Sequence, residues 1–127
     1  MNIKSLVKNV AEEETVQMEW GELTWLIGSA ANMSDAEQTF GVVKINPGKR
    51  NHLHTHPNCE EILYVLSGEC DHKLGDEMIK LKAGSVIRIP KGIKHWAKCT
   101  SEEPLVAVIS FSSPDRQTVN HEDDISL

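Results

Sequence analysis

The sequence predicts an all-β protein, either a sandwich or a barrel. Short apolar stretches recur about every ten residues, and residues that favour turns separate them. The only segment that reads as a helix, residues 34–37, is short and has little helical pattern after it. The 127 residues are enough to bury roughly two-thirds of the unfolded surface in one core. We therefore predict a single domain over residues 1–127.

The predicted strands follow one another closely along the chain. They cover residues 23–27, 39–45, 53–55 with its flanks, 61–66, 69–74, 77–81, 85–89, 95–99 and 105–111. The breaks between them contain glycine, proline and asparagine, which supply the positive or fixed φ that a turn requires. Residues 74–77 are expected to form a tight hairpin. The segment after Pro114 is polar and ends acidic, so we expect only part of it to be ordered.

Composition excludes several classes of partner. The formal net charge is −6 and the basic residues are dispersed, so nucleic acid is not expected as a partner. The N-terminus has no long apolar stretch, which argues against a signal peptide and against a membrane span. The chain has three cysteines, an odd number, and no CxxC pair. A framework of disulfides is therefore not expected, which favours a reducing compartment. We therefore expect a cytoplasmic protein with no membrane partner.

Histidines alternate with other residues between positions 50 and 56. Alternate residues of a strand share a face, so Arg50, His52, His54 and His56 are expected to point the same way, with Leu53 on the other face. The run has two interpretations. It is either a surface strand whose core residue is Leu53, or one wall of a cavity that holds a metal ion. The alternation by itself does not decide between them.

The chain from residue 48 to residue 99 resembles the two motifs of the cupin superfamily. The first stretch consists in order of Gly48, five residues, His54, Thr55, His56, four residues, Glu61, six residues and Gly68. The second consists of Gly84, five residues, Pro90, Lys91, Gly92, two residues, His95, three residues and Cys99. Each of these positions agrees with the motifs except Cys99, where the family usually has asparagine.

The resemblance implies a single-domain cupin, an all-β jelly-roll barrel also called a double-stranded β-helix. Its core would cover about residues 38–112, after an N-terminal extension with a strand (1–37) and before a polar C-terminal tail (113–127). The family roles fall on His54, His56, Glu61 and His95 as metal ligands, and the spacing to Gly68 favours Glu61 over Glu60. Three imidazoles and a carboxylate suit one divalent transition metal: Fe, Mn, Zn, Ni or Cu.

Other residues near the motifs are candidates for substrate chemistry. His52 shares the parity of the ligands and is the candidate catalytic group, for proton transfer. Arg50 could bind a substrate carboxylate or could be solvated. Cys99 is either a thiol in the pocket wall or a small buried apolar residue. Apolar positions are also expected to face the cavity, which favours a compact, partly apolar or keto-acid substrate: Val43, Ile45, Leu63 and Val65.

Two functions remain open on this interpretation. The first is a small-molecule metalloenzyme, dioxygenase-like or a metal-assisted isomerase, lyase or decarboxylase, acting on a compact oxygen-chelating substrate. The second is a non-catalytic module that binds or senses a small ligand. His52 facing the cavity would support the enzyme, and His52 facing solvent would weaken it. A homodimer is also expected, with a strand such as residues 23–27 added to the neighbour's sheet.

Overall fold

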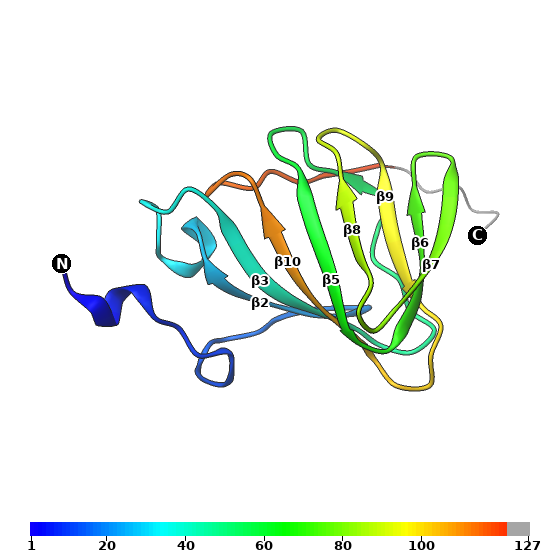
Figure 1. Cartoon of the computed structure of the whole chain (residues 1–127), viewed down its shortest axis with the longest axis horizontal. Coiled ribbons are helices and arrows are strands. Elements are labelled where there is room, and N and C mark those ends of the chain that lie inside the picture. The colour runs from blue at the N-terminus through cyan, green and yellow to red at the C-terminus, as the bar shows by residue number, and fades with distance from the viewer. Residues whose placement is uncertain (122–127) are drawn as a thin grey trace.

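The computed structural model describes residues 1–121 and consists mainly of two antiparallel β-sheets (Figure 1). One sheet has the strand order β1-β2-β3-β10-β5-β8, with bounds Val16–Met18, Gly21–Ile27, Thr39–Ile45, Leu105–Phe111, Glu61–Ser67 and Val86–Ile89. The other has the order β11-β4-β9-β6-β7, with bounds Val119–Asn120, His54–Thr55, His95–Cys99, Glu69–Leu74 and Glu77–Lys82. The all-β prediction is confirmed.

Strand positions agree closely with the alternation of the sequence. Strands β3, β6, β9 and β10 begin and end at the predicted residues. The predicted strand at 53–55 is shorter than expected, because β4 pairs only through His54 and Thr55. Strands β1 and β11 were not predicted. Both are exposed and only three and two residues long, too short for an alternating pattern to single them out.

The helix predicted at residues 34–37 is wrong. Residues 34 and 35 form a turn. The helices of the described chain are short 3₁₀ turns at Ile3–Leu6, Val10–Glu12 and Ser29–Ala31. An N-cap sequence with no apolar repeat behind it cannot offset the cost of helix nucleation. None of these helices has the length and apolar character that crossing a membrane requires.

The apolar core lies between the two sheets. Strands β3 and β10 alternate buried and half-buried residues along their whole length, and they pair with each other in register. From the opposite sheet, Cys70 of β6 and Cys99 of β9 are register partners with no exposed surface. Val65 and Leu105 of the first sheet are equally buried. The same two inner faces, continued along the strands, enclose the functional site.

Strand β2 bears on the expected assembly. Residues 23–27 were expected to add to a neighbour's sheet. Strand β2 pairs with β3 on one side, and on the other side it pairs with β1 only through Gly21, Glu22 and Leu23. The homodimer stays a prediction, as does the division of the chain into one domain with flanking segments.

The C-terminal tail packs against the five-stranded sheet. Strand β11 pairs with β4, and the backbone N–H of His121 donates to the carbonyl of Leu53 at 2.9 Å. Part of the tail is therefore built into the fold. Residues 122–127 of the predicted tail lie outside the described residues.

Gly68 offers a direct test of the fold. It has φ +79°, and a Cβ atom there would lie 2.5 Å from the carbonyl oxygen of Pro104. We expect Gly68→Ala to destabilise the protein by about 3 kcal/mol or more, measured by urea unfolding, because backbone strain and a clash with backbone add together. Gly84→Ala is the matched control, since φ is +92° there and a Cβ would have nothing within 4 Å. Equal losses of unfolding free energy in the two variants would contradict the close approach of the Pro104 carbonyl to Gly68.

Candidate metal centre

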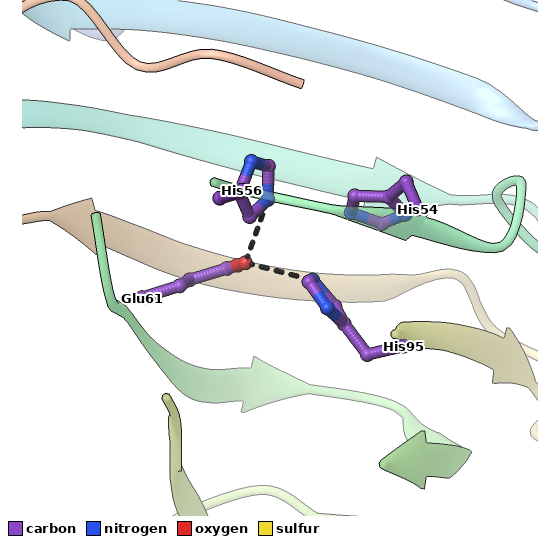
Figure 2. Close-up of side chains that lie close together, drawn as sticks. All are labelled: His54, His56, Glu61 and His95. Carbon is purple, nitrogen blue, oxygen red and sulfur yellow. Dashed lines mark hydrogen bonds and ion pairs between the residues drawn. The ribbon is translucent and has the colours of Figure 1, made fainter. Parts of the chain in front are cut away.

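Four buried side chains from separate parts of the chain converge between the sheets. His54 of β4 and His95 of β9 are register partners, His56 follows β4, and Glu61 begins β5 (Figure 2). One ligand atom from each of these residues lies within 4.8 Å of all the others. Bonds of about 2.0–2.2 Å place opposite ligands of a metal up to about 4.4 Å apart, so a small adjustment would bring all four to one ion.

Backbone carbonyls set the orientation of the three imidazole rings. Nδ1 of His54 donates to the carbonyl of His52 at 2.6 Å, and Nδ1 of His95 donates to that of Ile93 at 2.9 Å. Nδ1 of His56 donates to the carbonyl of Gln117, also at 2.9 Å. In a neutral ring, the other nitrogen, Nε2, then carries the lone pair. Outer hydrogen bonds of this kind are the ones that hold imidazoles for metal binding.

The geometry around Glu61 fits a cation. Nε2 of His95 lies 3.2 Å from Oε1 of Glu61, and Nε2 of His56 lies 3.3 Å from the same oxygen (Figure 2). With Nδ1 protonated, each of these contacts places a nitrogen lone pair against an oxygen lone pair. Such an arrangement is repulsive unless a proton or a metal ion lies between the atoms. Three imidazoles and one carboxylate are a donor set that suits a divalent transition metal.

The protonation states also suit a metal. Burial raises the pKa of Glu61. With a proton between the carboxylate and the rings, as in the metal-free protein, hydrogen bonds and charge from His56 and His95 outweigh burial and hold this pKa below its ordinary value. Burial, with the nearby His95, lowers the pKa of His54 to about 3. The carboxylate is therefore ionised and the His54 ring is neutral near pH 7, the forms that bind metal. Glu60 is different, because it pairs with exposed Arg88 at 2.8 Å on the outside of the sheet.

A cavity of about 410 Å³ opens beside the four residues. Much of its wall is apolar and comes from the six-stranded sheet. Val43, Ile45 and Leu63 line it as expected. Val65 does not line it, and is instead fully buried in the apolar core. The cavity is therefore large enough for a small organic molecule that has an apolar part.

The candidate catalytic residue lies on the solvent side of the cavity. His52 contributes to the cavity lining, but its side chain is exposed. It stands outside the two-residue strand β4, so the alternation of residues 50–56 does not carry its ring inward as it does His54 and His56. Its backbone carbonyl, rather than its ring, contacts the centre, through His54.

The two candidate substrate-binding residues lie elsewhere. The guanidinium of Arg50 stacks over Trp96, with Cζ 4.8 Å from the ring centroid, and Arg50 is not among the described residues that line the cavity. Of the two alternatives for Cys99, a thiol in the pocket wall or a small buried apolar residue, the structure agrees with the second. It has no exposed surface, and its thiol donates to the carbonyl of Glu103 at 3.3 Å.

Sequence reasoning missed several polar residues of the cavity, among them His72 and Arg116. His72 is 1% exposed and stacks parallel to His95 with ring centroids 6.0 Å apart, and its Nδ1 has no hydrogen-bond partner. Its parity with Cys70 on β6 could have revealed it, since alternate residues share a face. Arg116 belongs to the polar tail, which has no alternation of apolar and polar residues from which its place at the cavity could be predicted.

Known proteins resemble this chain in both sequence and fold. A family model described as the cupin domain matches residues 41–111. Germin-like protein subfamily 2 member 2 of Arabidopsis thaliana is 30% identical over 103 residues, which cover 68% of this chain and 46% of that protein. A protein of Streptomyces cyaneus named polyketide synthase CurC is 27% identical over 106 residues, which cover 84% of this chain and 68% of that protein. The chain spans about half the length of the germin-like protein.

Solved structures share the fold. Oxalate decarboxylase, in a structure concerned with its substrate binding mode and a reaction specificity switch, superposes with TM-score 0.79 at 25% identity, over 87% of this chain and 31% of that one. The Bacillus subtilis enzyme, in a structure concerned with its Mn(II) centres, has TM-score 0.79 at 24% identity, over 87% and 30% of the two chains. The jelly-roll prediction is thereby confirmed.

Proposed function

The chain belongs to the cupin domain family, and on that premise we propose that it is a mononuclear metalloenzyme for a compact, oxygen-chelating small molecule. The observation that carries the proposal is the set of four buried donor atoms within 4.8 Å of one another beside a cavity. In this proposal His54, His56, Glu61 and His95 are the ligands of one divalent transition metal. Fe, Mn, Zn, Ni and Cu all suit these donors, and the Mn(II) centres named for oxalate decarboxylase support testing manganese first.

The reaction would be dioxygenase-like or a metal-assisted isomerisation, lyase or decarboxylase reaction. When bound, the metal would supply Lewis-acid or oxygen-binding chemistry to an oxygen ligand of the substrate. The chain's own residues would exclude water and hold the substrate against the apolar wall formed in part by Val43, Ile45 and Leu63. The similarity to oxalate decarboxylase supports the decarboxylase branch.

The second candidate is a non-catalytic module that binds a small ligand. The exposure of His52 favours it, because the group expected to transfer protons at the metal has its side chain in solvent. The cavity would serve either function. Small-molecule binding is common to both, and neither needs nucleic acid or a membrane. The cytoplasmic location stays a prediction.

The test begins with protein purified without added metal. We expect elemental analysis to find about one divalent transition metal ion per chain. Iron would favour the oxygenase branch, and zinc or manganese the isomerase, lyase or decarboxylase branch. The loaded protein is then assayed for oxygen consumption and product formation with catechols, diketones and keto acids. Turnover would exclude the binding module. A tight ligand with no turnover over the whole panel would support the binding module.

A further inference from the structure

Arg116 places a cation in the wall of the cavity. It belongs to the segment that runs from the end of β10 to β11, drawn in red-brown in Figure 1. Its Cζ lies 4.5 Å from the ring centroid of Trp25 and 5.0 Å from that of Phe111. Phe111 in turn lies with its ring centroid 4.9 Å from that of His56. Arg116 is therefore one aromatic ring away from the proposed metal ligands.

The backbone on both sides of Arg116 is held in place by one side chain. The amide nitrogen of Asn58 donates to the carbonyl of Asp115 at 2.8 Å, and the amide oxygen of Asn58 accepts from the backbone N–H of Gln117 at 3.0 Å. The carbonyl of Gln117 also accepts from His56. The guanidinium is thus positioned in advance, which reduces the entropy lost when it binds a ligand.

The charge of Arg116 has no carboxylate partner in the chain as described. Within residues 1–121 it forms no ion pair, and its Nε is buried without a hydrogen-bond partner. Burial lowers the pKa of Arg116, while the charge of Glu61 raises it. Arginine stays protonated at any ordinary pH. Since a buried polar group without a partner costs free energy, the site favours a ligand that supplies an acceptor.

Charge and shape together define that ligand. A divalent metal and Arg116 would outweigh the single negative charge of Glu61, so the loaded cavity would be positive and would favour an anion. Trp25 and Phe111 hold the guanidinium on an aromatic surface, and apolar residues of β3 and β5 line the cavity beyond it. The 410 Å³ volume leaves room for more than a carboxylate group alone.

We propose that Arg116 binds the carboxylate of the substrate, and that the substrate is an organic acid with an apolar body. This inference rests on the proposed metal site and adds the substrate class and the residue that selects it. Arginine suits the role because its planar guanidinium can bind both oxygens of a carboxylate at once. Arg116 takes the position at the cavity that the sequence had suggested for Arg50.

The experiment compares an acid with its neutral analogue. Three 2-oxo acids with apolar side chains, 2-oxo-3-phenylpropanoate, 4-methyl-2-oxopentanoate and 3-methyl-2-oxobutanoate, and their amides are titrated into the metal-loaded protein by calorimetry. We expect Arg116→Gln to weaken binding of the acid about tenfold or more, as loss of a charge-assisted hydrogen bond does, and to leave binding of the amide unchanged. Arg116→Lys should retain part of the preference for the acid.

Arg88→Gln is the matched control, because it removes the same charge from an exposed residue that pairs with Glu60 on the outer surface. It should bind acid and amide as the wild type does. Equal affinity of Arg116→Gln and wild type for the acid would overturn the proposal. So would an equal loss in Arg88→Gln, or failure of the wild type to bind any of the three acids.

Metal content and thermal unfolding are measured for every variant to separate this inference from the metal site. Loss of metal from Arg116→Gln would mean that the residue acts by holding the His56 segment, which would also overturn the proposal. The titrations are repeated after chelation. If the wild type holds no metal yet still prefers the acid through Arg116, the proposed metalloenzyme fails while the role of Arg116 stands.

Discussion

Replacing His54 and His95 together with alanine is expected to abolish metal retention. These two residues are register partners on β4 and β9, and each contributes one of the four donor atoms. Changing an outer partner of a metal ligand already costs about 10- to 100-fold in affinity, so loss of two ligands should cost more. The measurement is elemental analysis of desalted protein, with the unfolding temperature recorded with and without added metal.

His52→Ala is the control for the double variant. It removes an imidazole two residues from His54 but keeps the backbone carbonyl that holds the His54 ring. It should retain one metal ion per chain. Glu61→Gln adds a second comparison, since it preserves the size of the side chain and removes only its charge. Stoichiometric metal in the double variant after desalting would show that the four side chains are not the ligands.

The metal-free protein is expected to lose stability as the pH falls from about 6.5 to 3. Burial lowers the pKa of His54 from 6.5 to about 3 and that of His72 from 6.5 to about 4. At a pH between the unfolded and the folded pKa of each ring, the unfolded chain binds a proton that the folded protein does not bind. Acid therefore favours unfolding. Glu61 acts in the same direction below its unfolded value of 4.5, because its pKa is held low in the fold.

The expected loss is up to about 3 kcal/mol for each of the two rings between pH 7 and pH 4, since one unit of pKa shift corresponds to about 1.4 kcal/mol. Urea unfolding of chelated protein across this range measures it. His72→Leu should flatten the curve, because it removes a buried imidazole whose Nδ1 has no partner. His52→Leu, at an exposed position, should leave the curve unchanged. A pH-independent free energy of unfolding would be inconsistent with neutral, buried rings at positions 54 and 72.

Bound metal should make the free energy of unfolding fall more steeply as the pH decreases. Protons and the metal ion compete for the same lone pairs of His54, His56 and His95, so the stabilisation by bound metal falls as the pH falls. At pH 7, added metal should raise the unfolding temperature of the wild type and leave that of the double variant unchanged. The difference between the two curves isolates the contribution of the site from that of the fold.

The strands and the four convergent residues could be predicted because their signals are local. A strand places alternate residues on one face, and this period is visible in β3 and β10 without any knowledge of their partners. The motif resemblance singled out His54, His56, Glu61 and His95, and the structure brings them together.

The other parts of the site depend on contacts that local pattern does not contain. Arg50 also pairs with the partner strand of β4, through a bridge to Lys98 of β9, but the register shifts by one residue between this bridge and the His54–His95 pair. The alternation that groups Arg50 and His52 with His54 is therefore interrupted. Arg50 stacks on Trp96, a residue 46 positions away. Extending the period across this break in register was therefore the source of both misplacements.

The sequence by itself determined the all-β architecture, because alternation follows from backbone geometry. It also indicated the residues at the centre, because their spacing resembles the cupin motifs. Only the tertiary structure decided what surrounds that centre. The polar tail folds across β4, where Gln117 holds His56 and Arg116 reaches the cavity over Phe111. These neighbours are set by pairing between residues that are far apart in the sequence. Because the tail has no apolar periodicity, its own sequence does not predict the surface against which it packs.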